Sequence, residues 1–307
     1  MSADIEVLYD HDADVDRCLA VLAVAYATDR FTRDWWEWKH QSGPWGPSRP
    51  VLVTSESGDL GAFFALPWCY RAGGVRIPGV RVVDGGTTPA ARRRGVLQAM
   101  IRREVITWGD ENPGIVVATA TPQAQGSHLK NGATVLPPLR YHLGLVSGVG
   151  AFLRPARLRE GLDVLDDYQS DDSAGIGSDW SPAALRWRTD PRSGNTYAVA
   201  ALAEATAPNG LVYRIANLAR LRVLIPLATW GSRREVAVLL GSALRRSRGV
   251  AVYSPAGPGA VDLPVRWVKG RSEVLVCVWE RGRLPADCDP TVLSGWRLGC
   301  AEVEGLI

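Results

Sequence analysis

The sequence predicts a mixed α/β fold, an α+β arrangement around a mixed sheet, in two successive units. The first half begins with helical patterns, continues with an antiparallel hairpin and ends as strand–loop–helix–strand–helix–strand. The second half repeats several landmarks of the first at nearly constant spacing, which indicates an internal duplication. A chain of 307 residues is long enough for two units that each bury a core, and we place them at 1–155 and 156–307.

Each element of the first half follows from the spacing of its apolar residues. Apolar residues at helical spacing, or in short runs bounded by turn residues, distinguish helices from strands. Helices are expected over 14–27, 31–39, 96–105 and 125–131, and strands over 50–54, 61–66, 75–83, 114–119 and 140–145. The Asp-rich segment 157–179 has the composition of an exposed linker between the two units.

The duplication is indicated by a small set of matched residues. The spacing between partners is constant at first and then falls, which predicts shorter loops in the second unit. The pairs are Trp38 with Trp187, Lys39 with Arg188, Gly61 with Gly210, Thr88 with Thr229, and Gly114 with Gly249.

Composition excludes several classes of protein. A formal net charge of +3 is too small to indicate nucleic-acid binding. The five cysteines are odd in number and lack a Cys-x-x-Cys spacing, so neither a disulfide framework nor a zinc site is expected. The sequence contains no apolar run as long as a membrane span and does not begin with a signal-peptide pattern. We therefore expect a cytoplasmic protein without membrane or metal partners.

One basic loop carries most of the functional information. Residues 84–97 read Asp-Gly-Gly-Thr-Thr-Pro-Ala-Ala-Arg-Arg-Arg-Gly-Val-Leu and join an apolar strand to a helix. Backbone N–H groups at a helix N-terminus bind anions, and arginine adds charge and forked donors. The spacing fits neither the Gly-x-x-x-x-Gly-Lys-Ser/Thr phosphate loop nor the three-glycine dinucleotide loop. The loop therefore predicts a phosphate site of another kind.

The pattern Pro-x-x-Arg-x-x-Gly, formed by Pro89, Arg92 and Gly95, resembles the acyl-CoA pyrophosphate loop of the GNAT superfamily of N-acetyltransferases. Leu97 stands where that family usually has a small residue. The run Arg-Arg-Arg-Gly-Val-Leu is similar to the loop of the multi-domain, enhanced-intracellular-survival type. The order of elements in the first half also resembles the GNAT fold, so we expect two tandem GNAT-like domains.

The resemblance implies an acyl-CoA-dependent N-acyltransferase. Such an enzyme transfers the acyl group, most often acetyl from acetyl-CoA, directly to a primary amine. The acceptor is expected to be a small molecule, such as an amino sugar or an amino-acid-derived metabolite. The pyrophosphate would bind at Arg92, Arg93, Arg94, Gly95, Val96 and Leu97, and the pantetheine arm along Gly86, Thr87 and Thr88.

Two residues are candidates for proton transfer. His128 lies four residues before Gly132, where the family often places a tyrosine that protonates the leaving thiolate. Asp84 ends the central strand, where a carboxylate can bind or deprotonate the incoming amine. Each has a structural alternative, because Asp before Gly-Gly often caps its own loop and a lone histidine often packs in a core. Glu37, His40 and the C-terminal carboxylate of Ile307 remain alternative bases.

Four tryptophans, Trp35, Trp36, Trp38 and Trp45, are expected near the acceptor side, either as core or as an aromatic wall.

The second unit is expected to be degenerate. Trp230 replaces the loop proline, and by the matched spacing Glu235 and Val236 stand where Arg94 and Gly95 stood. Two other functions remain open: a Fem-type transferase that uses aminoacyl-tRNA, and a CoA-binding sensor or scaffold without catalysis.

Overall fold

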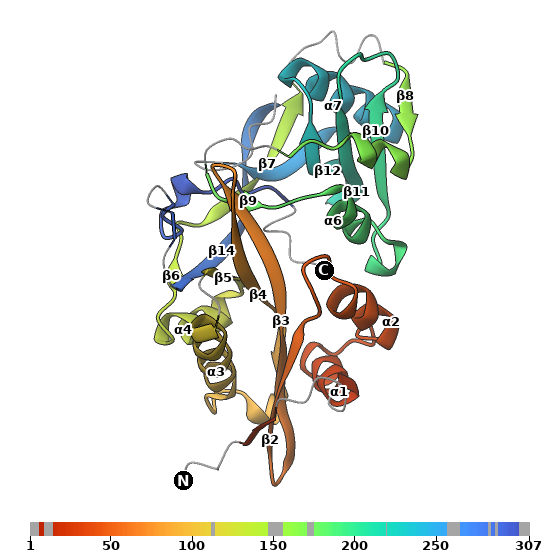
Figure 1. Ribbon diagram of the computed structural model, residues 1–307. Helices are drawn as coiled ribbons and strands as arrows, with labels where there is room; N and C mark the ends of the chain where they lie inside the picture. The colour runs from red at the N-terminus through yellow and green to blue at the C-terminus, as the bar shows by residue number, and fades with distance from the viewer. Residues whose placement is uncertain are drawn as a thin grey trace.

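The computed structural model describes residues 6–8, 15–111, 114–146, 156–170, 175–218, 220–256, 265–281, 284–285 and 288–300. Both halves contain strands and helices, with runs of successive strands between the helices (Figure 1). In the first half the helices are α1 (Val15–Tyr26), α2 (Arg33–Trp36), the π-helix η1 (Glu37–Gln41), α3 (Val96–Glu111) and α4 (Pro122–Lys130). The strands there are β1 (Glu6–Leu8), β2 (Arg49–Ser55), β3 (Gly58–Ala72), β4 (Val75–Thr87), β5 (Gly114–Ala120), β6 (Thr134–Val135) and β7 (Leu139–Val146).

Among the described residues, the second half has fewer α-helices than the first and a similar succession of strands. Its helices are α6 (Pro182–Arg188) and α7 (Arg233–Ser247), and its strands are β8 (Leu158–Glu160), β9 (Gly177–Ser178), β10 (Tyr197–Leu202), β11 (Gly210–Leu218), β12 (Leu221–Trp230), β13 (Ala251–Ala256) and β14 (Val265–Arg281). The mixed α/β fold class is therefore confirmed.

The order of strands repeats in mirror image across the sheet. The path is β1-β2-β3-β4-β5-β14-β7-β13-β12-β11-β10-β8. On each side of its centre, three antiparallel pairings are followed by one parallel pairing, β4 with β5 and β12 with β13. The two halves therefore use the same topology twice, as the matched residues predicted.

The last strand of each half lies in the sheet of the other. β14 pairs antiparallel with β5, and β7 pairs antiparallel with β13. The two exchanged strands also pair with each other, so β14 belongs to both parts of the sheet. The boundary between residues 155 and 156 stays a prediction. Strands that precede it in the sequence are hydrogen-bonded to strands that follow it.

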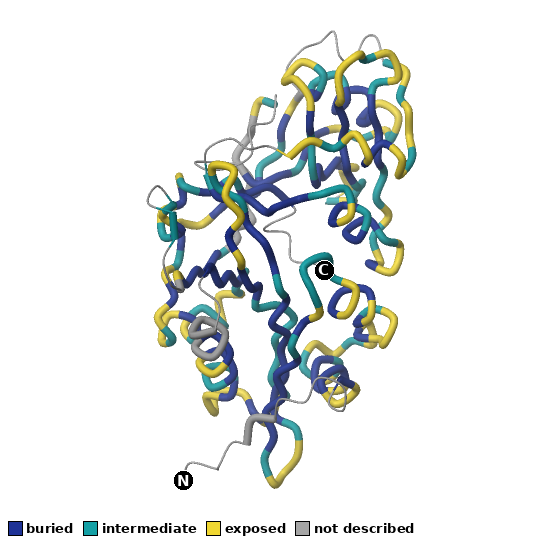
Figure 2. Tube along the Cα trace, in the orientation of Figure 1, coloured by how far each residue is buried: buried dark blue, intermediate teal, exposed yellow. Residues whose placement is uncertain are grey.

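Helices cover both faces of each half, and their apolar faces form separate clusters. In the first half α1 and α2 pack on one face, against residues that include Leu52 and Phe64, while α3 packs on the other, against Phe63 and Val80. Figure 1 shows these helices on opposite sides of β3 and β4, and Figure 2 shows their inward sides buried. A third cluster spans both halves and contains Trp38 and Trp187.

The expectation of an exposed linker over 157–179 is wrong for the described part of that segment. β8 pairs with β10, and a 3₁₀ turn (Leu162–Asp167) buries Val164 and Leu165 completely. Ile176 is also buried. Asp163, Asp166 and Asp167 are exposed beside these buried apolar residues, whereas Asp179 is 8% exposed and pairs with Arg71.

Candidate functional site

A β-bulge interrupts the hairpin of β3 and β4 at the start of the basic loop. Ala62 pairs with Gly86 and Phe64 pairs with Val83, so Asp84 and Gly85 together oppose Phe63. Asp84 adopts a left-handed backbone with φ of 49°. Asp tolerates this region better than most residues, at a cost of about 1–2 kcal/mol. The bulge bends β4 away from its regular course.

β4 and β5 part next to this bulge. Their parallel pairing runs from Gly79 with Ile115 to Val82 with Ala118 and ends there. β4 continues to Thr87 with β3 as its partner, and β5 continues to Ala120 with β14 as its partner. From Val83 onward the β5-facing edge of β4 is therefore not used by β5, and such an edge can accept an extended ligand.

The loop after β4 leads into the N-terminus of α3. Ala99 N–H donates to the Gly95 carbonyl over 2.9 Å, which makes Gly95 the cap of the helix. Gly95 has φ of 79° and Arg93 has φ of 63°, so the chain turns sharply before the helix. A glycine cap supplies no side-chain acceptor, which leaves the first N–H groups of α3 open to an outside anion.

The three arginines of the loop are exposed but differ in their contacts. Arg92 Nη2 donates to the carbonyl of Ala25 at the end of α1, over 3.2 Å. Within the described residues no carboxylate lies at ion-pair distance from Arg93 or Arg94. Arg92 thus also fastens the loop to α1, while its neighbours face solvent.

The other residues that were predicted to bind the cofactor would offer it backbone groups rather than side chains. Val96 is buried and packs against Gly61, and Leu97 is half-buried. Gly86 and Thr87 pair with β3 through Ala62 and Gly61. Thr88 N–H donates to the Leu60 carbonyl over 2.9 Å, so that donor is already engaged.

Asp84 lies in a buried cluster that the sequence did not predict as a unit. Lys39 Nζ lies 2.5 Å and His40 Nε2 lies 3.2 Å from Asp84 Oδ2. Burial alone would raise the pKa of Asp84, but the Lys39 ammonium and the His40 hydrogen bond lower it to about 2. Burial lowers the pKa of Lys39 to about 8 and that of His40 to about 4. Asp84 is therefore a carboxylate held by a cation at neutral pH.

His128 occupies a different environment. It lies in the last turn of α4, is 5% exposed, and its ring meets Trp279 of β14 at a centroid distance of 5.3 Å. Burial lowers the pKa of its imidazole to about 4. Trp279 packs in the cluster beneath α3, whereas Asp84 contacts η1 beside α2. The two candidate catalytic residues thus face opposite sides of the sheet.

Lys39 was missed as a functional candidate, although its match with Arg188 was available. The alternative base His40 is completely buried, with Nδ1 2.8 Å from Ser48 Oγ, whereas Glu37 is exposed. Ile307 lies outside the described residues. Among the tryptophans, Trp36 and Trp38 are buried, and Trp35 and Trp45 pack partly buried against the core, which agrees with the core interpretation.

The corresponding loop of the second half is closed by its own side chains. α7 begins at Arg233, and Ser232 caps it in a capping box with Glu235. Ser232 N–H donates to Glu235 Oε2 over 2.8 Å, and Glu235 N–H donates to Ser232 Oγ over 3.3 Å. The matching of Val236 with Gly95 is therefore wrong, because the loop is shorter and Ser232 is the residue at the helix cap.

The second half also differs at its bulge. Val212 pairs with Ala228 and Tyr213 with Pro226, which places Leu227 at the position that Asp84 holds in the first half. Leu227 is 6% exposed and lies in the core. The second bulge therefore carries no charge.

Trp230 is the last residue of β12 and pairs with Gly210, as Thr87 pairs with Gly61, so the prediction that Trp230 replaces the loop proline is wrong. The side chain of Trp230 lies over Gly210. A β-carbon built on Gly210 would lie 2.0 Å from its ring.

The described helices include none that is long and apolar enough to cross a membrane. No group of metal-ligating side chains occurs among the described residues. The described helices also form no long helical hairpin of the kind that a Fem-type transferase would require.

Comparison with known proteins supports the fold. Neither a family model nor a curated protein matches the sequence. A GCN5-related N-acetyltransferase from Anabaena variabilis is similar in structure, with a TM-score of 0.66 and 12% identity over 91% of this chain and 73% of that one. One from Kribbella flavida has a TM-score of 0.61 and 17% identity, over 90% and 71%. Eis1 from Mycobacterium abscessus has a TM-score of 0.58 and 15% identity, over 89% and 72%.

Proposed function

The fold of this chain is that of the GCN5-related N-acetyltransferases, and from that premise we propose that the chain is an acyl-CoA-dependent N-acyltransferase. The reaction would transfer an acetyl group from acetyl-CoA to the primary amine of a small molecule. The observation that carries this proposal is that the open N-terminus of α3 follows, along the chain, the β4 edge that β5 leaves unused, and we call these two features together the binding path.

CoA would bind along this path with its pyrophosphate at the helix. The free N–H groups after Gly95 and the guanidinium groups of Arg93 and Arg94 supply donors and positive charge to the phosphates. Arg92 would contribute its remaining donors while staying fastened to α1. The pantetheine amides would then pair with backbone groups of Gly86 and Thr87 on the edge of β4 that β5 leaves unused.

The reaction would proceed by direct attack of the amine on the thioester carbonyl. The C–N bond forms as the C–S bond breaks, the amine loses a proton, and the thiolate gains one. Backbone N–H groups near the bulge can stabilise the oxyanion, because they are fixed before the reaction begins. Asp84 and His128 remain our proposals for base and acid. The low pKa values of both groups count against these roles and favour the second function described below.

The acceptor would bind between the two halves. A cavity of about 400 Å³ lies there, lined by Arg33, Trp36, Glu37, Gln41, Ser42 and Arg192. Its first five residues belong to α2, η1 and the following turn, and Arg192 belongs to the second half, in the 3₁₀ turn Pro191–Ser193. A volume of this order suits a small metabolite. We also propose a cytoplasmic location, because five cysteines without a Cys-x-x-Cys spacing do not indicate a disulfide framework.

Thiol release from acetyl-CoA, measured against a panel of amino sugars, amino acids and polyamines, tests the activity. Calorimetric titration with CoA tests the binding path separately. The expected result is binding of CoA together with amine-dependent release of thiol. Failure to bind CoA would overturn the proposal.

A second function is favoured by one observation, the placement of Asp84 and His128 on opposite faces of the sheet with pKa values far from neutrality. A CoA-binding sensor or scaffold would need the binding path but no acid and base. Binding of CoA without thiol release across the panel would support it. If transfer occurs, His128→Ala and Asp84→Asn decide the roles of these residues, because loss of the general acid lowers turnover by about 10²-fold or more.

A further inference from the structure

The buried cluster at Asp84 links the proposed site to the second half of the chain. We propose that Lys39 is a positioning residue that holds the β4 bulge in its active shape, and that the second half keeps Lys39 in place through Trp187. This inference rests on the proposed function for its kinetic consequence but not for its structural one.

The bulge needs an external restraint. Asp84 has a backbone conformation that is unfavourable for a residue with a side chain, and such conformations persist only where the surroundings fix them. Lys39 and His40 contact the same carboxylate oxygen, and both are at most 1% exposed. Tyr26 Oη donates to the Gly85 carbonyl over 2.8 Å and restrains the next residue. The shape of the bulge is therefore set by side chains of α1 and η1.

The π-helical turn directs three successive side chains to three partners. π-helical turns are rare and often occur at functional sites. Within η1 Lys39 reaches Asp84, and His40 stacks on Phe64 at a centroid distance of 4.1 Å. Trp38, the residue before Lys39, reaches away from the bulge to Trp187.

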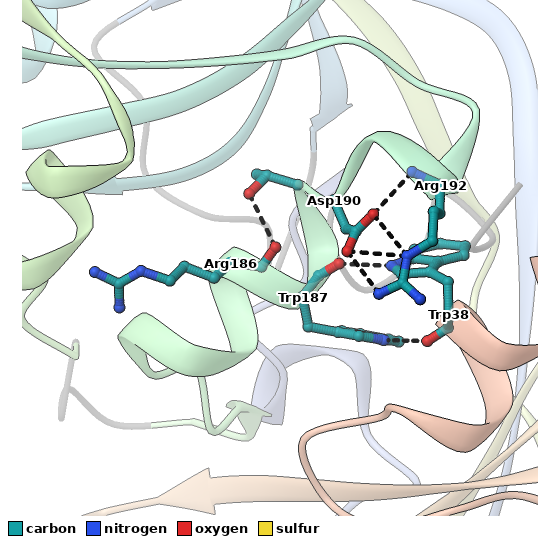
Figure 3. A network of polar contacts seen from close by, with 6 residues as sticks. Trp38, Arg186, Trp187, Asp190 and Arg192 are labelled. Carbon is teal, nitrogen blue, oxygen red and sulfur yellow. Dashed lines mark hydrogen bonds and ion pairs between the residues drawn. The ribbon is translucent and has the colours of Figure 1, made fainter.

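Trp38 and Trp187 form a reciprocal pair between the halves. Trp38 Nε1 donates to the Trp187 carbonyl over 2.7 Å, and Trp187 Nε1 donates to the Trp38 carbonyl over 2.8 Å (Figure 3). Their rings stack at 5.7 Å. Each residue gives the other the same contact, as in a two-fold symmetric interface. The backbone of η1 next to Lys39 is thus fixed by the second half.

The second half contains a matching tryptophan and a basic residue after it, but its bulge has no charged residue. Leu227 occupies the bulge position, and Arg188, the counterpart of Lys39, lies over the ring of Tyr197 at 5.3 Å. The asymmetry assigns a role to the second half: it braces the bulge of the first half without having a charged bulge of its own.

The inference predicts a separation between binding and turnover. The pyrophosphate site at Gly95 lies on α3, on the other face of the sheet from η1. Loosening the bulge should displace the backbone groups that face the thioester and leave the phosphate site intact. Lys39→Met and Trp187→Phe should therefore lower kcat at least about tenfold and raise the Kd for CoA by a smaller factor, because only the contacts of CoA with Gly86 and Thr87 lie next to the bulge.

Hydrogen exchange tests, independently of activity, whether Lys39 and Trp187 hold the bulge in place. Amides of 84–87 should exchange at least about tenfold faster in Lys39→Met and in Trp187→Phe, which keeps an aromatic ring but loses the indole N–H. Lys39→Arg keeps a cation and should restore part of the protection. Trp230→Phe is the matched control: Trp230 is 4% exposed, lies in the second half, and should leave exchange of 84–87 unchanged.

Unchanged exchange in both Lys39→Met and Trp187→Phe would overturn the inference, and so would equal acceleration in Trp230→Phe. If Lys39→Met fails to fold, Trp187→Phe and Lys39→Arg still decide. If the wild-type protein binds no CoA, the proposed function is refuted. The exchange of amides 84–87 still tests whether Lys39 and Trp187 hold the bulge in place.

Discussion

Acidification should destabilise the protein through His128, and the size of the effect follows from its burial. The imidazole is 5% exposed against Trp279, and burial lowers its pKa from 6.5 to about 4. Between these two pH values the unfolded chain binds a proton that the folded chain does not. The stability is therefore complete above pH 6.5 and falls as the pH drops toward 4.

The pKa difference corresponds to roughly 3 kcal/mol in full, and to about 2 kcal/mol at pH 5. Urea denaturation of wild type and His128→Phe at pH 7.5 and pH 5 isolates this term, because the other titrating groups occur in both proteins. We expect the wild type to lose about 2 kcal/mol more than the variant. An equal loss in both would show that His128 titrates normally, which would refute the argument and strengthen its case as a general acid.

Three further predictions concern the loops. Gly95→Glu should abolish CoA binding measured by calorimetry, because the new carboxylate repels the pyrophosphate. The control variant Gly132→Glu, at a glycine with a similar φ of 82° and open surroundings, should bind CoA normally. Equal affinity of the two variants for CoA would contradict the loop assignment. One chain should bind one CoA, because the capping box at Ser232 occupies the second helix N-terminus; two equivalent sites in a titration would overturn this. Ser232→Ala should lower the free energy of unfolding by about 1 kcal/mol in denaturant melts and leave CoA affinity unchanged, whereas a change in affinity would place CoA at α7.

Local patterns predicted the elements well because their causes are local. The first helix was expected over 14–27 and spans Val15–Tyr26, and the strand expected over 114–119 spans Gly114–Ala120. Apolar spacing and turn residues decide such elements within a few residues of sequence. The match of Val236 with Gly95 failed although the capping-box signature that marks the start of α7, Ser232 to Glu235, is present in the sequence.

The candidate site depends on contacts that no local pattern reports. The phosphate loop was predicted, but the pairing of Asp84 with Lys39 joins residues on different elements and requires both the bulge and the π-turn. The exchange of β7 and β14 is equally non-local, because either strand could have paired within its own half. The match of Trp38 with Trp187 indicates duplication, and in the structure these two residues also contact each other.

The two halves show how little of the site is specified by the sheet itself. Both contain a bulge at the same place, and in both the parallel pairing of the central strands ends early. They differ in the bulge residue, Asp84 against Leu227, and in the residue at the helix cap, Gly95 against Ser232. The strand edge that is exposed where the two parallel strands separate can therefore pair with an extended ligand. The open helix N-terminus and the charged bulge then determine which half can use that place.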